Sequence, residues 1–248
     1  MPKLLIYTVT SGHYCDYTAL WEYCIAHSYP EYDYKSMEVE EPPIKYFAAC
    51  YRLFNQPTKR HDYVYVTDVD MMILREDPTL LDFHLKEMKQ TKLSYSNSPR
   101  TSEYLGDSRM TGLHFANMYW YQQTLMEREA HLRLLNEAKI GDRAVDDEIC
   151  LMNICKNAHL RIPSPRPLAT RHHGIHLGTL RHYPNHSKQT RNQQLLLRIS
   201  PYKAKQWLKF YDDTEFVKIV KAVSKKNREI KLELDTLYSF CRRWEKQL

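Results

Sequence analysis

Short apolar runs alternate with helical periodicity over residues 1–188. The apolar runs are rich in β-branched and aromatic residues and end at polar or turn-forming residues, which is typical of buried strands. Such strands are expected at residues 3–9, 32–39, 63–67, 93–96 and 113–117. Helices are expected at 16–27, 44–54, 119–138 and 147–157. Alternating strands and helices predict an α/β domain with a mainly parallel sheet.

Residues 189–248 have a different pattern, without glycine and with apolar residues three and four positions apart. This spacing is typical of amphipathic helices. The apolar positions that carry it are Phe216, Val217, Val220, Val223, Ile230, Leu234, Leu237, Cys241 and Trp244. We therefore expect a first domain over residues 1–188 and a helical C-terminal extension over 189–248 that packs on it.

The charge of the chain favours anionic ligands. The formal net charge is +6, and residues 201–248 hold twelve lysines and arginines against seven acidic residues. The extension is expected to cap the first domain or to dock on a membrane surface or a partner protein. Zinc-finger, RNP-like and helix-turn-helix signatures are absent from the sequence, so nucleic acid is not an expected partner.

The expected compartment is the cytoplasm. The sequence shows neither a signal-peptide pattern at its start nor a run of about 18 apolar residues that would cross a membrane. The six cysteines form no CxxC pair, and we expect free thiols, mostly buried.

A pair of carboxylates follows the most strand-like segment of the chain. Asp68 and Asp70 come directly after residues 63–67, and residues two apart in an extended chain point the same way. Two converging carboxylates repel one another unless a cation neutralises them, and oxygen ligands suit Mn²⁺ or Mg²⁺. The pair therefore predicts a metal site at a strand end, although an Asp-x-Asp also occurs by chance in solvated turns.

Histidines, glycines and arginines alternate over residues 171–182. Imidazole is a good ligand for divalent metals, and glycine lets the backbone close around a phosphate. The segment has neither cysteine pairs nor a His-Glu-x-x-His helix, so a separate zinc site is not expected. We expect one histidine, His176 or its rival His173, to complete the Asp68/Asp70 site.

An acidic run, Asp146-Asp147-Glu148, precedes the helix expected at 147–157. Acidic residues suit a helix N-terminus for capping and dipole reasons alone. Three in succession indicate that one of them faces the reacting groups of a substrate.

Together these motifs resemble the glycosyltransferases of the GT-A fold, most of all the glycogenin and bacterial galactosyltransferase type. The resemblance lies in the Thr-rich turn and aromatic residue after the first strand, the Asp-x-Asp, Thr111-Gly112, the acidic segment with Asn153, and the spacing from Gly178 to Arg181. It implies a Rossmann-like α/β/α sandwich that transfers a sugar, most often from a UDP-sugar, to a hydroxyl of a glycan or glycoprotein acceptor.

The resemblance also implies roles for individual residues. Asp68, Asp70 and His176 would hold Mn²⁺ or Mg²⁺, and Asp146 or Asp147 would act at the reacting centre. The expected donor contacts are Thr8, Thr10, Tyr14, Arg52, Asp68, Gly178 and Arg181. An acid at position 147, where the retaining enzymes carry an amide, favours inversion with a carboxylate as general base.

Two other functions compete with sugar transfer. A nucleotidyltransferase acting on sugar phosphates also uses metal-bridging carboxylates, but it needs a basic glycine-rich loop after the first strand, and Thr10-Ser11-Gly12-His13 lacks lysine and arginine. An inactive GT-A scaffold would have no reason to keep three candidate metal ligands.

Overall fold

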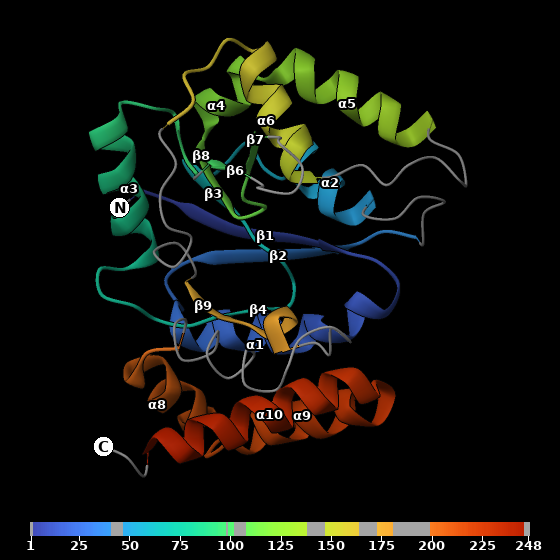
Figure 1. Cartoon of the computed structure of the whole chain (residues 1–248), viewed down its shortest axis with the longest axis vertical. Coiled ribbons are helices and arrows are strands. Elements are labelled where there is room, and N and C mark those ends of the chain that lie inside the picture. The colour runs from blue at the N-terminus through green and yellow to red at the C-terminus, as the bar shows by residue number, and fades with distance from the viewer. Residues whose placement is uncertain are drawn as a thin grey trace. The chain divides into compact units, whose positions relative to one another are not determined.

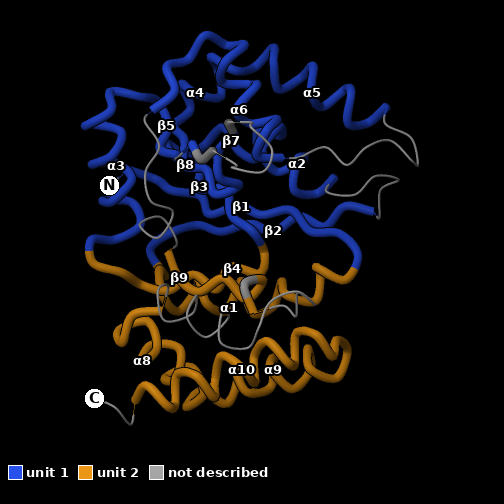
Figure 2. The backbone as a smooth tube through the Cα atoms, viewed as in Figure 1, with its two compact units in different colours: residues 1–12, 31–68, 78–168 blue, residues 13–30, 69–77, 169–248 orange. Residues whose placement is uncertain are grey.

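The structure is a computed structural model that describes residues 2–40, 47–97, 99–101, 108–137, 147–163, 173–180 and 199–245. The chain forms two compact units, and it passes between them several times (Figure 2). Unit 1 contains residues 1–12, 31–68 and 78–168, and unit 2 contains 13–30, 69–77 and 169–248. The boundary predicted between residues 188 and 189 lies outside the described residues.

Unit 1 is built on a five-stranded sheet in the order β2-β1-β3-β8-β5 (Figure 1). Its strands are β1 (Leu4–Thr10), β2 (Asp33–Glu38), β3 (Tyr63–Val66), β5 (Tyr95–Ser96) and β8 (His114–Asn117). β1 pairs in parallel with β2 and β3, whereas β8 is antiparallel to both β3 and β5.

The prediction of an α/β architecture is therefore confirmed. The sheet is mixed, because β2, β1, β3 and β5 run in one direction and β8 runs in the opposite one. The reversal of β8 follows the hairpin of β6 (Pro99–Thr101) and β7 (Ser108–Met110). This hairpin follows β5 and turns the chain back, so that β8 enters the sheet between β3 and β5 in the opposite direction.

The helices of unit 1 are α2 (Phe47–Phe54), α3 (Leu80–Thr91), α4 (Met118–Gln123), α5 (Leu125–Glu137) and α6 (Asp147–Asn157). Alternate residues of β1, including Leu5, Tyr7 and Val9, join one buried core with residues of α2 and α6. The helix predicted at 119–138 is two helices that meet at Thr124, whose hydroxyl donates to the Trp120 carbonyl at 2.8 Å.

Unit 2 joins a two-stranded sheet to a group of helices. The sheet pairs β4 (Met71–Ile73) with β9 (Gly174–His176), and the short helix η3 (Leu177–Leu180) follows directly. The other helical segments are η1 (Gly12–Tyr17), α1 (Thr18–Ser28), α8 (Pro201–Phe210), α9 (Thr214–Lys226) and α10 (Arg228–Glu245).

The C-terminal helices are amphipathic, as predicted, and bury Trp207, Phe216 and Leu237. Two tyrosines connect them to the N-terminal part of this unit. Tyr17 donates to the buried Glu233 at 2.6 Å, and Tyr23 donates to Asp213 at 2.6 Å. The C-terminal helices therefore share contacts with η1 and α1 of the same unit.

The structure also tests the expectations for the cysteines and for membrane-spanning helices. All six cysteines are free, and all except Cys15 are buried, as predicted. Among the described helices, none has the length and apolar character needed to cross a membrane.

Candidate metal centre

The chain places Asp68 and Asp70 by two sets of backbone hydrogen bonds. The Thr67 amide donates to the Tyr7 carbonyl at 3.0 Å, which extends the β1–β3 pairing up to Asp68. On the other side, the Asp70 carbonyl accepts from the Leu177 amide at 2.9 Å, where β4 begins to pair with β9. The Asp-x-Asp segment thus lies between two strands that are each fixed by pairing.

His176 reaches this segment through strand register. Antiparallel pairing sets Met71 opposite His176, the last residue of β9. The His176 Nε2 atom lies 3.1 Å from Asp70 Oδ1. Asp68 is only two residues before Asp70, and one ligand atom from each of Asp68, Asp70 and His176 lies within 4.8 Å of the others. These three residues could hold a metal ion.

The chemistry of these donors fits a hard to borderline divalent cation. Two carboxylate oxygens and one imidazole nitrogen suit Mn²⁺, and oxygen-rich sites also take Mg²⁺. Only 5% of the Asp70 side chain is exposed, and a carboxylate so buried requires a cationic or hydrogen-bonding partner. Because 26% of the His176 side chain and 33% of the Asp68 side chain are exposed, the group remains accessible to a ligand.

Arg52 connects Asp68 to a second carboxylate. Its guanidinium pairs with Asp68 Oδ1 through Nη1, and Nη2 lies 3.3 Å from Asp147 Oδ2. The arginine side chain is only 4% exposed. Burial lowers the pKa of the guanidinium, but the charges of Asp68 and Asp147 raise it more, and the balance lies above its ordinary value. Arg52 is therefore held as a buried cation between the two acids.

Gly112 allows this close approach. A Cβ at that position would lie 2.9 Å from Arg52 Nη2 and 3.1 Å from Asp147 Oδ2, so a larger residue would collide with the ion pair. The structure thus brings Gly112 and Asp147, which belong to two motifs of the resemblance, close together. Thr111 itself is buried, and its hydroxyl bonds to Asn97 Oδ1 at 3.0 Å and to the Leu113 carbonyl at 2.9 Å.

His173, the rival metal ligand, belongs to a different cluster. It is buried, and its Nδ1 atom lies 3.6 Å from Glu76 Oε2. Glu76 also pairs with Lys203 Nζ at 2.7 Å. Burial raises the pKa of Glu76, but hydrogen bonding to His173 and the charge of Lys203 lower it more, so the balance lies below its ordinary value. Among the described residues, His176 is the histidine that lies with the two aspartates.

The residues expected to contact the donor nucleotide lie on and just after β1. Thr8 and Thr10 are buried, and the Thr8 hydroxyl has no hydrogen-bond partner among the described residues. Tyr14 lies in η1 and is partly exposed, with its ring 4.4 Å from the ring of His13 and 6.1 Å from that of Tyr17. Their contact with a donor stays a prediction.

Of the other residues expected at the site, some lie among the described residues and some lie outside them. Gly178 is buried in η3, directly after the strand that carries His176. Asp146 and Arg181 lie outside the described residues. Glu148, the third member of the acidic run, is buried, with Oε2 3.4 Å from Arg109 Nε, so its carboxylate faces a cation other than Arg52.

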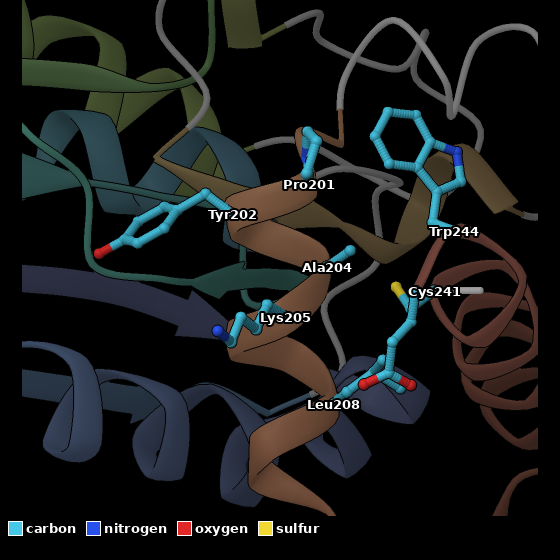
Figure 3. Close-up of a pocket in the computed structure, with 8 residues that line it drawn as sticks. Pro201, Tyr202, Ala204, Lys205, Leu208, Cys241 and Trp244 are labelled. Carbon is cyan, nitrogen blue, oxygen red and sulfur yellow. The ribbon is translucent and has the colours of Figure 1, made fainter. Parts of the chain in front are cut away.

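A pocket of about 360 Å³ lies elsewhere, between α8 and α10 of unit 2. Ala204 and Leu208 point toward Cys241 across it, with Trp244 at one end (Figure 3). Its lining contains one lysine and one glutamate but no cluster of carboxylates or histidines. It therefore lacks the groups that a metal ion or a diphosphate requires.

Glu76 and Lys203 were missed by the sequence reasoning. Glu76 is one of three consecutive charged residues after an apolar strand, and Lys203 is one of many lysines in the C-terminal helices. Helix α8 meets the segment after β4 through contacts between residues far apart in the sequence, and three-residue strands such as β4 leave almost no periodic signal.

Comparison of the chain with models of known families, with curated proteins and with solved structures gave no match.

Proposed function

We propose that this chain is a metal-dependent glycosyltransferase. It would transfer a sugar from a nucleoside diphosphate donor, most often a UDP-sugar, to a hydroxyl of a glycan or another acceptor. We also propose that the mixed α/β sheet with its helices is a GT-A fold. The order of the motifs along the chain, from the turn after β1 to the histidine of β9, supports this proposal.

One observation carries the proposal. Asp68, Asp70 and His176 offer one ligand atom each within 4.8 Å, and Asp68 is also paired with a buried arginine that reaches Asp147. A divalent ion held by these three residues would supply Lewis-acid stabilisation of the diphosphate leaving group. Sugar transfer releases a negatively charged diphosphate while positive charge develops on the sugar. A cation site with a second carboxylate, that of Asp147, nearby would suit both changes of charge.

The chain's own residues would divide the work of binding and orientation. Asp70 and His176 hold their positions through the β4–β9 pairing, and Asp68 is oriented by Arg52. Arg52 also keeps Asp147 beside the Gly112 backbone. Such fixed charges cost no reorganisation when the transition state forms, which is the usual origin of electrostatic catalysis.

The ion pair between Arg52 and Asp147 bears on whether sugar transfer retains or inverts the configuration of the anomeric carbon. A general base must accept a proton, whereas a neighbouring guanidinium favours the charged carboxylate and opposes protonation. Asp147 Oδ2 faces Arg52 at 3.3 Å, so the geometry favours a role in stabilising positive charge at the sugar over a role as general base. This contact favours retention over the inversion that the sequence alone favours.

Calorimetric titration with nucleoside diphosphates tests the proposal. The chain should bind one of UDP, GDP, CDP or ADP tightly in Mn²⁺ and weakly or not at all in EDTA, because a metal held by Asp68, Asp70 and His176 would attract the diphosphate. Asp70→Asn should bind as weakly in Mn²⁺ as the wild type does in EDTA. Equal binding with and without metal, or binding of none of the four, would overturn the proposed function.

A further inference from the structure

The C-terminal helix α8 contacts β9, the strand that carries His176, through the side chain of Lys203. Lys203 Nζ lies 2.7 Å from Glu76 Oε1 and donates to the Gly174 carbonyl at 3.2 Å. The Gly174 amide donates to the same Glu76 oxygen at 3.0 Å. The first residue of β9 is thus held on both its amide and its carbonyl by one partly buried ion pair.

A second contact from α8 fixes the segment that follows β4. Gln206 accepts from the Arg75 amide at 3.1 Å and donates to the Arg75 carbonyl at 2.6 Å. Lys203 and Gln206 are three residues apart, so they lie on the same face of the helix. We call these two residues the α8 clamp.

The α8 clamp adds to the backbone hydrogen bonds from Leu177 to Asp70 and from Leu74 to His173 that flank the β4–β9 pairing. β4 and β9 have three residues each, and their pairing sets Met71 opposite His176 and Ile73 opposite Gly174. Gly174 has a φ of 132°, and a Cβ there would lie 2.0 Å from the Met72 carbonyl oxygen, so the two backbones are in close contact. A shift of β9 along β4 would move His176 away from Asp70.

We propose that Lys203 and Glu76 are positioning residues for the metal centre, which makes metal affinity depend on the docking of α8. Neither residue is a ligand. The ion pair acts through Gly174, at one end of β9, on His176 at the other end. The inference rests on the proposed function only through the metal site; it requires neither a nucleotide nor a sugar.

Mn²⁺ affinity of the full-length chain, measured by calorimetry without nucleotide, tests the inference. Lys203→Met should weaken Mn²⁺ binding about tenfold, the usual effect of removing a residue that orients a ligand. Lys209→Met, an exposed lysine on the same helix, is the matched control and should leave the Kd unchanged. Glu76→Gln should weaken binding similarly, and the double variant should be no worse than either single one, because both remove the same ion pair.

A measurement on the wild type covers the case in which Lys203→Met does not fold. Coupling between two sites is reciprocal, so Mn²⁺ should slow hydrogen exchange of the backbone amides in residues 202–210. Unchanged exchange there, or an unchanged Kd in a folded Lys203→Met, would overturn the inference, as would a wild type that binds no Mn²⁺. Metal binding that responds to Lys203 in a chain that binds no nucleotide would uphold the inference and reject the proposed function.

Discussion

Replacing Arg52 with methionine should destabilise the chain and at the same time tighten metal binding. The substitution keeps most of the buried volume but leaves Asp68 and Asp147 without their shared cation. Removing one partner of a fully buried ion pair costs about 3–5 kcal/mol. Here 33% of the Asp68 side chain and 18% of the Asp147 side chain remain exposed, so solvent screening reduces the cost.

We therefore expect Arg52→Met to lower the free energy of unfolding by about 2–4 kcal/mol in EDTA, between the values for buried and exposed pairs. Metal affinity should change in the opposite direction. Without Arg52, Asp68 loses a cation that competes with the metal and the site loses a nearby positive charge, which should tighten Mn²⁺ binding at least about tenfold, equivalent to about 1.4 kcal/mol.

Urea unfolding of both proteins with and without Mn²⁺ measures both effects. Arg128→Met is the matched control, because Arg128 is equally buried but donates to the carbonyls of Phe54 and Tyr121 at 2.6 and 2.7 Å. Both variants should be destabilised in EDTA, and only Arg52→Met should gain more stability from Mn²⁺ than the wild type does. Equal Mn²⁺ stabilisation of the two variants would refute the reasoning.

Four other predictions concern neighbouring features. Gly112→Ala should lower the free energy of unfolding by about 1–3 kcal/mol in a urea melt, because its Cβ would press on Arg52 and Asp147; an unchanged midpoint would argue against that packing. Asp147→Asn should lower kcat about a hundredfold in donor turnover assays with little change in nucleotide affinity, and wild-type turnover would remove Asp147 from the mechanism. The partners of Glu76 lower its pKa below 4.5, so its contribution to stability is present above that pH and is lost as the pH falls below it. Urea melts of Glu76→Gln and wild type should therefore differ most near neutral pH and converge in acid. The alternative in which the basic C-terminal helices dock on an anionic membrane predicts that phosphatidylserine vesicles float the wild type but not a variant with three exposed α9 lysines changed to glutamine, each lysine contributing about 1 kcal/mol. Lys231→Gln, whose lysine pairs with Asp235 in the wild type, should still float. The lysines to change are Lys218, Lys221 and Lys225.

Much of the local structure could be predicted because strong signals specify it. The apolar run before Asp68 predicts β3, and the helix expected at 147–157 has the observed bounds. Asp68 and Asp70 share a strand end by chain geometry alone, so the sequence was sufficient to nominate them. Choosing His176 over His173 required the β4–β9 register, which no residue pattern encodes.

The parts that were missed depend on contacts between distant segments. The direction of β8 follows from the β6–β7 hairpin, whose strands are too short to show a period of two. The helix α3 was not predicted from the sequence, although Thr79 caps it by accepting a hydrogen bond from the Asp82 amide. The Glu76–Lys203 pair joins residues from opposite halves of the chain, and neither residue type stands out locally.

Phosphorus NMR of the wild-type chain incubated with individual nucleotide sugars tests the central claim most directly. Each reaction is stopped with excess EDTA before the spectrum is recorded, because paramagnetic Mn²⁺ broadens the resonances of a diphosphate that it binds. Resonances of a free nucleoside diphosphate should then appear from one donor class incubated in Mn²⁺, because water can replace the acceptor hydroxyl, and they should be absent after incubation in EDTA and with Asp70→Asn. Donors that stay intact with the wild type in Mn²⁺ and a panel of sugar acceptors, or release that is equal in the wild type and Asp70→Asn, would contradict a metal-dependent glycosyltransferase.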